Sequence, residues 1–155
     1  MLSILGEYDC KVDAKGRFMF PNGLKKQLGD KVLEKGFVVN RNLHQPCLVI
    51  YTADEWEKLS NKLSKLNRLI KKNDVFVRRV MGGATPVELD GSGRMLLPKS
   101  LIDYAGISKE IKVVGSGNVI EVWDKSKLED VMKEDVSENE ALAEEVFKTL
   151  GESGE

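Results

Sequence analysis

The chain has 155 residues, of which 41% are apolar and 32% charged, with a formal net charge of −1. This length allows one domain with a buried core, or two small domains. No apolar run approaches the roughly 20 residues of a membrane-spanning helix, and residues 1–8 lack the basic start and long apolar stretch of a signal peptide. We therefore expect neither export nor a membrane partner.

The net charge hides an uneven distribution. Residues 125–155 hold 4 basic and 10 acidic side chains, so the other 124 residues carry 20 basic against 15 acidic ones, a charge of +5. A mildly basic body with an acidic tail is compatible with binding a polyanion.

The segment that follows the first predicted strand recurs 77 residues later. Residues 13–24 (DAKGRFMFPNGL) return as residues 90–101 (DGSGRMLLPKSL), with Asp, Gly, Arg, Pro and Leu identical in one register. Even four matches have odds on the order of 10⁻⁵ by chance. The chain is therefore predicted to be two copies of a unit of roughly 45 residues, packed together with strands exchanged between them.

Each copy predicts a strand, a tight turn, a strand, a short helix, a strand, a loop and a strand. Asp can accept hydrogen bonds from backbone N–H groups in the turn, and Gly supplies a positive φ. The apolar runs 18–20 and 95–97 predict strands that are covered on both faces. Pro and Gly residues bound short helices over 22–28 and 99–105.

The later segments of the two copies also align. Residues 37–39 match 112–114, and 48–51 match 120–123, with a hairpin turn expected at 115–118. Between the copies, apolar residues at helical spacing predict one helix over 53–72, favoured as a packing helix over a DNA-reading one. The tail, 125–148, predicts one or two helices, with a Ser-x-x-Glu capping box at Ser137–Glu140.

Few residues suit catalysis or metal binding. Cys10 and Cys47 are predicted to be free, buried thiols, and the only histidine, His44, lies in a turn-like stretch. The chain lacks a phosphate-binding loop, a Gly-x-Ser-x-Gly motif and a metal-binding cluster. We therefore expect no enzyme, no catalytic residue, no metal and no cofactor.

The repeated Asp-x-x-Gly-Arg motif has two interpretations. A planar guanidinium beside a glycine turn suits phosphate groups or guanine edges, which makes Arg17 and Arg94 candidate DNA-binding residues. Nearby lysines add to this candidate set: Lys15, Lys25 and Lys99. Alternatively, each Arg simply pairs with its Asp. Four residues are assigned to the turn structure itself: Asp13, Gly16, Asp90 and Gly93.

The chain resembles the MraZ family of bacterial transcriptional regulators along nearly its whole length. The resemblance rests on Gly6-Glu7-Tyr8, on residues 13–17 with Pro21, and on residues 90–98, 104–107, 113–115 and 120–123. It implies a mixed α+β fold, in which two tandem AbrB-like swapped-hairpin units form a pseudo-symmetric β-barrel. The boundaries that follow are 7–54 for the first unit, 55–82 for a connecting helix and linker, 83–126 for the second unit, and 127–155 for an acidic helical tail.

The resemblance also implies a function. Family members are cytoplasmic, nucleoid-associated, ring-forming homo-oligomers that bind short direct repeats of double-stranded promoter DNA without a cofactor or a small-molecule substrate. They regulate the division and cell-wall gene cluster that contains their own gene, here as an expected repressor. The family's DNA-contacting arginine maps onto Arg17 and, by the repeat, onto Arg94, and a further basic residue maps onto Lys25.

One departure from the family pattern concerns the second copy. Ile102 stands where the first copy has Lys25, and Gly91-Ser92 replaces Ala14-Lys15. We therefore expect the first copy to make most phosphate contacts. An alternative function also stays open: an AbrB-like, antidote-type protein–protein module whose acidic tail binds a partner protein.

Overall fold

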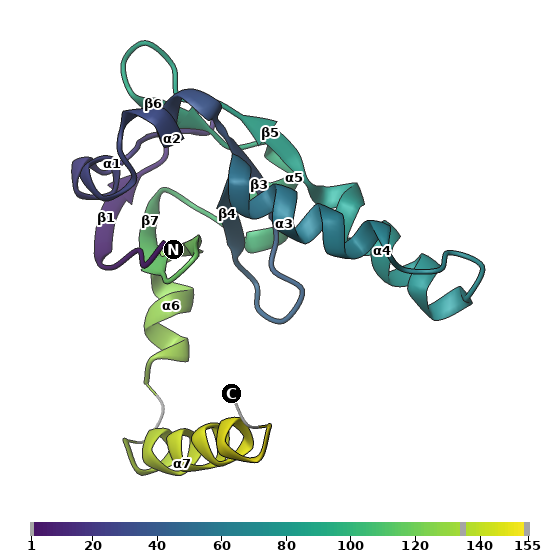
Figure 1. Cartoon of the computed structure of the whole chain (residues 1–155). Helices are drawn as coiled ribbons and strands as arrows, with labels where there is room; N and C mark the ends of the chain where they lie inside the picture. Colours follow the sequence, from purple (N-terminus) through teal and green to yellow (C-terminus); the bar gives the residue numbers. More distant parts are fainter. Residues whose placement is uncertain (1, 134–135, 154–155) are drawn as a thin grey trace. The chain divides into compact units, whose positions relative to one another are not determined.

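The computed structural model describes residues 2–133 and 136–153, except for the side chains of residues 136, 137 and 151–153. The chain divides into two compact units, Met1–Lys125 and Ser126–Glu155. The first unit is mixed α+β (Figure 1). Its elements follow the order β1 (Glu7–Lys11), β2 (Arg17–Met19), α1 (Asn22–Leu28), α2 (Asp30–Lys35), β3 (Phe37–Arg41), β4 (Leu48–Thr52), α3 (Ala53–Ser64), α4 (Lys71–Gly83), β5 (Thr85–Val87), β6 (Arg94–Leu96), α5 (Lys99–Ala105), β7 (Glu110–Ser116) and β8 (Val119–Asp124).

The strand order shows how the two repeats combine. Six strands form one antiparallel sheet in the order β1-β7-β8-β4-β3-β5, and β2 pairs with β6 in a separate two-stranded ribbon. Exchanging each strand for its counterpart in the other repeat reverses this order and leaves every pairing unchanged. The predicted exchange of strands is confirmed, and the hydrogen-bonded order of the described strands runs from β1 to β5.

The strand registers place a pseudo-twofold axis in the molecule. Val49 on β4 pairs with Glu121 on β8, and Phe18 on β2 pairs with Met95 on β6. Each pair joins equivalent positions of the two repeats. A residue can lie opposite its own counterpart only on an axis that relates the two copies, so this axis passes through the β4–β8 pair and through the ribbon.

The third strands of the repeats align one residue away from the sequence-based match. Phe37 pairs with Val87, and Ile111 pairs with Cys10, which is the counterpart of Val87. Phe37 and Ile111 are both buried. Phe37 is therefore equivalent to Ile111 and not to Lys112. The prediction was wrong by one position because apolar residues stand on both faces here, so side-chain alternation did not specify the register.

The short helices α1 and α5 form as predicted and cover the core. Each follows a proline, and each ends before a glycine with positive φ, Gly29 at 83° and Gly106 at 60°. Leu24 and Leu101 occupy equivalent positions in these helices and are 0% and 2% exposed. The helix α2 was not predicted, and only the first repeat contains it among the described residues.

The predicted helix over residues 53–72 is two helices. The helix α3 ends at Ser64, and α4 begins at Lys71. The intervening turn is held by Asn67, whose Oδ1 accepts from the Leu69 N–H at 3.0 Å and whose carbonyl accepts from Asn73 Nδ2 at 3.1 Å. The packing role is confirmed, because Leu63 of α3 is buried with two residues of α4, Val77 and Val80.

The second unit contains two helices, as one of the predicted alternatives had it. They are α6 (Lys125–Val131), which begins at the boundary between the units, and α7 (Val136–Ser153). The side chain of Ser137 lies outside the described residues, and with it the predicted capping box. Four apolar side chains of α7 are exposed: Leu142, Val146, Phe147 and Leu150.

Candidate nucleic-acid interface

The first repeated motif forms a turn in which one carboxylate holds the backbone and the arginine together. Asp13 Oδ1 accepts hydrogen bonds from the backbone N–H groups of Lys15 and Arg17, each at 2.9 Å. Asp13 Oδ2 accepts from Arg17 Nε at 2.9 Å. Because Nε carries this bond, the two terminal nitrogens of Arg17 are left for other acceptors. The carboxylate therefore fixes both the turn and the direction of the guanidinium.

The second motif repeats this arrangement. Asp90 Oδ1 accepts from the N–H groups of Ser92 and Arg94 at 2.9 Å each, and Asp90 Oδ2 accepts from Arg94 Nε at 3.1 Å. The predicted Asp–Arg pairing is confirmed in both turns. An exposed pair of this kind contributes little to stability, so its main consequence is the orientation of the arginine.

The electrostatics of both turns favour ionised carboxylates. The backbone N–H of Arg17 is the largest cause that lowers the pKa of Asp13 below its ordinary value, and the side chain of Arg17 adds to it. The backbone N–H of Arg94 acts in the same way on the pKa of Asp90. Neither carboxyl group has the raised pKa that a general acid would need at neutral pH.

Glycine is required at the tip of each turn. Gly16 and Gly93 have φ angles of +90° and +81°, and a Cβ atom on Gly16 would lie 2.8 Å from the carbonyl oxygen of Leu97. Each turn is also hydrogen-bonded to the residue that follows the ribbon strand of the other repeat. The Gly16 carbonyl accepts from the Leu97 N–H at 2.8 Å, and the Gly93 carbonyl accepts from the Phe20 N–H at 3.1 Å. The two turns are therefore one connected structure.

The β2–β6 ribbon presents both arginines on one face. Phe18 and Met95 point into the core and are 1% and 0% exposed. In the antiparallel register, Arg17 lies opposite Leu96 and Met19 lies opposite Arg94. Because directly opposed residues share a face, these four side chains form the outer face of the ribbon.

The expectation that both faces of these strands are covered was wrong. Met19 and Leu96 are each 52% exposed. The strands β2 and β6 pair with each other, and β6 has a further isolated bridge, between Met95 and Leu89. The continuous apolar run did not indicate that one face is exposed, because the covering of a strand's faces depends on contacts with distant segments and not on the local pattern.

The predicted lysines lie at the turns, but Lys25 and Lys99 lie at the turn of the other repeat and not at the turn of their own. The Lys25 ammonium lies beside Gly93 in the second turn, and its counterpart Ile102 lies beside Gly16 in the first. Lys15 of the first turn and Lys99 of the second repeat line one hollow of about 470 Å³. Each turn thus combines its own arginine with a lysine of the other repeat.

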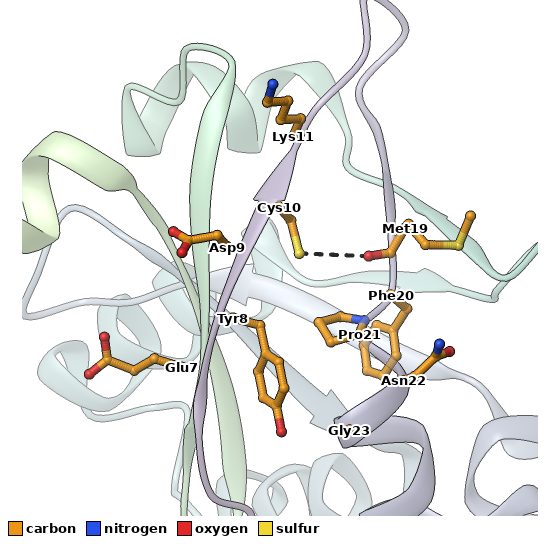
Figure 2. Close-up of a pocket in the computed structure, with 10 residues that line it drawn as sticks. All are labelled: Glu7, Tyr8, Asp9, Cys10, Lys11, Met19, Phe20, Pro21, Asn22 and Gly23. Carbon is orange, nitrogen blue, oxygen red and sulfur yellow. Dashed lines mark hydrogen bonds between the residues drawn. The ribbon is translucent and has the colours of Figure 1, made fainter.

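A second hollow lies at the equivalent place in the other half of the molecule (Figure 2). It has a volume of about 720 Å³ and is lined by residues that include Tyr8, Cys10, Met19 and Pro21. The Cys10 thiol donates to the Met19 carbonyl at 3.7 Å. Cys47 is buried as predicted, whereas Cys10 is half-buried, and both are free.

The described residues also bear on two other kinds of site, a metal site and a site that uses histidine chemistry. Within residues 2–133 and 136–153, no three His, Cys, Asp or Glu side chains are grouped as metal ligands. His44 is exposed in the loop between β3 and β4.

None of the helices in the described part of the chain combines the length and the apolar character of a membrane span.

Comparison with known proteins agrees with the internal repeat. The MraZ family model, described as "MraZ protein, putative antitoxin-like", matches the chain twice, over residues 3–79 and 80–149. A solution structure of PHS018 from Pyrococcus horikoshii is also similar, with a TM-score of 0.31 and 18% identity over 78% of this chain and 89% of that one, a likeness too weak to bear on function.

Curated relatives cover almost the whole chain. The transcriptional regulator MraZ of Christiangramia forsetii is 45% identical over 95% of this chain and 94% of its own length. The proteins of the same name from Flavobacterium psychrophilum and Acetivibrio thermocellus are 43% and 38% identical, over 98% and 91% of this chain and 96% and 94% of their own lengths. These three relatives are named transcriptional regulators, and with two matching repeats and relatives of this similarity the chain belongs to the MraZ family.

Proposed function

We propose that the protein is a sequence-specific DNA-binding transcriptional regulator, and that the outer face of the β2–β6 ribbon binds the DNA. The observation that carries the proposal is the pair of arginines, Arg17 and Arg94, which aspartates orient on one exposed face. Two-stranded antiparallel ribbons fit the major groove of B-DNA, where arginine can bind guanine O6 and N7 with two hydrogen bonds.

The lysines supply the sequence-independent part of the binding. Lys15, Lys25 and Lys99 lie at the turns that flank the ribbon. Phosphate contacts from such residues position a protein on the duplex, while contacts to base edges select the sequence. The charge of +5 on residues 1–124 favours the approach to DNA.

The same proposal includes the assembly that family resemblance implies. Ring-shaped homo-oligomers present copies of the ribbon in rotation, which suits short direct repeats in a promoter. Linking several weak sites then raises the overall affinity. The expected targets are the protein's own promoter and the division and cell-wall gene cluster, with repression as the outcome and the cytoplasmic nucleoid as the location. The swapped-hairpin units would form a pseudo-symmetric barrel, with no cofactor involved.

A test of this proposal measures binding by fluorescence anisotropy at two salt concentrations. The probes are a duplex from the region upstream of the protein's own gene and a scrambled duplex of equal composition. Wild type is compared with Arg17→Ala and with Arg79→Ala, a control because Arg79 is exposed on α4, away from the ribbon.

We expect wild type and Arg79→Ala to prefer the upstream duplex, and Arg17→Ala to lose most of this preference while keeping its fold and its oligomeric state. Equal binding of both duplexes that moderate salt abolishes would show charge attraction alone. A folded Arg17→Ala variant with full affinity for the upstream duplex would refute the assignment of the site.

A second candidate function rests on α7. Its exposed apolar side chains lie at helical spacing, with acidic residues between them, as an interaction helix would have. This favours the open alternative of a protein–protein module whose tail binds a partner. One observation points the other way. Antidote-type tails that fold on binding are typically disordered in the free protein, whereas α7 is already a helix. Removal of residues 126–155 distinguishes the two functions, because DNA binding should survive the truncation whereas binding of a partner protein by the tail should be lost.

A further inference from the structure

Two exposed apolar side chains share the ribbon face with the arginines. Met19 and Leu96 occupy equivalent positions of the two repeats, and each is 52% exposed. Single exposed apolar residues are ordinary on protein surfaces. Here, however, the pseudo-twofold axis repeats the exposed side chain, and both copies lie on the face that we assign to DNA.

The fold holds each apolar side chain beside an arginine. Leu96 is directly opposite Arg17, and Met19 is directly opposite Arg94. Leu96 Cδ1 lies 3.7 Å from the position of a Cβ on Gly16, and Met19 Sδ lies 3.7 Å from the position of a Cβ on Gly93. Each side chain thus lies over the turn of the other repeat. Figure 2 shows the Met19 side chain extending from its strand away from Cys10.

The chemistry of the major groove offers one apolar group for such a side chain. Each thymine carries a 5-methyl group there, while guanine presents two acceptors that suit arginine. An arginine and an apolar side chain about 5 Å apart at Cβ can therefore contact neighbouring base pairs. A flat apolar protein partner fits this face less well, because it would remove water from the terminal nitrogens of two guanidinium groups without offering them an acceptor.

We propose that Met19 and Leu96 are specificity-determining residues, and that each contacts the 5-methyl group of a thymine while the arginine opposite it contacts the adjacent part of the groove. The inference rests on the proposed function and adds to it. Arginines alone would select guanine, and the apolar pair makes the protein select thymine as well.

The test begins with the preferred duplex of the wild-type protein, obtained by selection from a random duplex library. Each thymine in that duplex is then replaced singly by deoxyuridine, which keeps the base pair and removes only the methyl group. Affinities are measured by anisotropy for wild type, Met19→Ala, Leu96→Ala and the control Met81→Ala. Met81 is an exposed methionine on α4, outside the ribbon.

We expect deoxyuridine at one or a few positions to weaken wild-type binding about fourfold each, the effect of exposing roughly one buried methyl group. The penalty at one set of positions should disappear in Met19→Ala, and the penalty at another set in Leu96→Ala. Met81→Ala should show the wild-type pattern. Both ribbon side chains are exposed, so we expect all variants to keep the wild-type melting temperature.

Three outcomes would overturn the inference. If wild type selects a preferred sequence but tolerates deoxyuridine everywhere, the thymine contact is wrong and the DNA-binding function stands. If the penalties persist unchanged in both alanine variants, other residues read the methyl groups, and the exposed pair serves another surface, such as a protein partner. If wild type selects no sequence, the proposed function fails together with the inference.

Discussion

Phe18 and Met95 lie directly opposite each other in the β2–β6 ribbon, and they are also equivalent positions of the two repeats. Both are buried, so their neighbours in the sequence point outward. The pseudo-twofold axis therefore passes through the ribbon itself and makes the two Asp-x-x-Gly-Arg turns parts of one surface. Neither turn is a complete site by itself, because each contacts the strand and the helix of the other repeat.

The tip glycines should be essential for stability. Gly16→Ala would place a side chain at φ +90° and 2.8 Å from a backbone oxygen, which costs on the order of 1–3 kcal/mol or more. Gly91→Ala in the second turn is the matched control, because its Cβ would meet no atom within 4 Å. Urea denaturation should show a lower unfolding free energy for Gly16→Ala only. Equal stability of the two variants would contradict this account of the turn.

The turn carboxylates predict a pH dependence of stability. Folding lowers the pKa values of Asp13 and Asp90, so the stabilisation they provide is complete above their unfolded pKa of about 3.9 and is lost as pH falls through the lower folded values. Asp13→Asn/Asp90→Asn should be less stable than wild type at pH 6, and this difference should shrink below about pH 4.

Two other aspartates, Asp9 and Asp74, also have lowered pKa values and remain in the double variant. Their acid-induced loss of stability cancels when the two curves are subtracted. Urea midpoints between pH 2.5 and 6, measured for wild type and the double variant at each pH, provide the measurement. If the difference in unfolding free energy between wild type and the double variant increases at low pH, the predicted role of the two carboxylates is contradicted.

Lys25 should contribute to DNA binding through the second turn. If it contacts a phosphate, Lys25→Ala should reduce the slope of log affinity against log salt by about 0.9, without a change in the preferred sequence. Lys72→Ala on α4 is the control, since Lys72 is exposed and outside the ribbon. Affinity of Lys25→Ala that equals wild type at every salt concentration would remove Lys25 from the interface.

Neither thiol should react readily in the folded protein. Burial raises the pKa of Cys10 to about 11, and burial together with the charge of Glu121 raises the pKa of Cys47 to about 12. The reactive thiolate is therefore scarce near pH 8. A chromogenic disulfide reagent should modify both thiols slowly in buffer and quickly in urea. Cys10→Ser identifies the faster one, and rapid native labelling of Cys47 would contradict its burial.

The sequence predicted those features whose causes are local. Aspartate, glycine and proline at fixed spacing determine the turns, the strand ends and the helices α1 and α5, and the repeat revealed that these elements occur twice. Other features depend on contacts between distant segments. Lys25 lies beside the second turn only because the strands are exchanged, and Met19 is exposed because the core packs only against the opposite face of β2, which carries Phe18.

The helices show the same limit. The break between α3 and α4 carries no proline or glycine, and it exists because Asn67 holds a turn while Leu63 packs against Val77 and Val80. The helix α2 lies between two glycines, Gly29 and Gly36, in a segment where the repeats differ in length and gave no second copy for comparison.

The central claim is that the two turns form one DNA-binding surface, and Arg94→Ala tests it most directly. Anisotropy with the preferred duplex should be measured for Arg17→Ala, Arg94→Ala and the control Arg79→Ala, after thermal unfolding has shown that each variant is folded. The pseudo-symmetric surface predicts that Arg94→Ala loses sequence-specific affinity to an extent similar to Arg17→Ala, while Arg79→Ala binds as wild type does. A folded Arg94→Ala variant with wild-type affinity would contradict the claim and confine binding to the first turn.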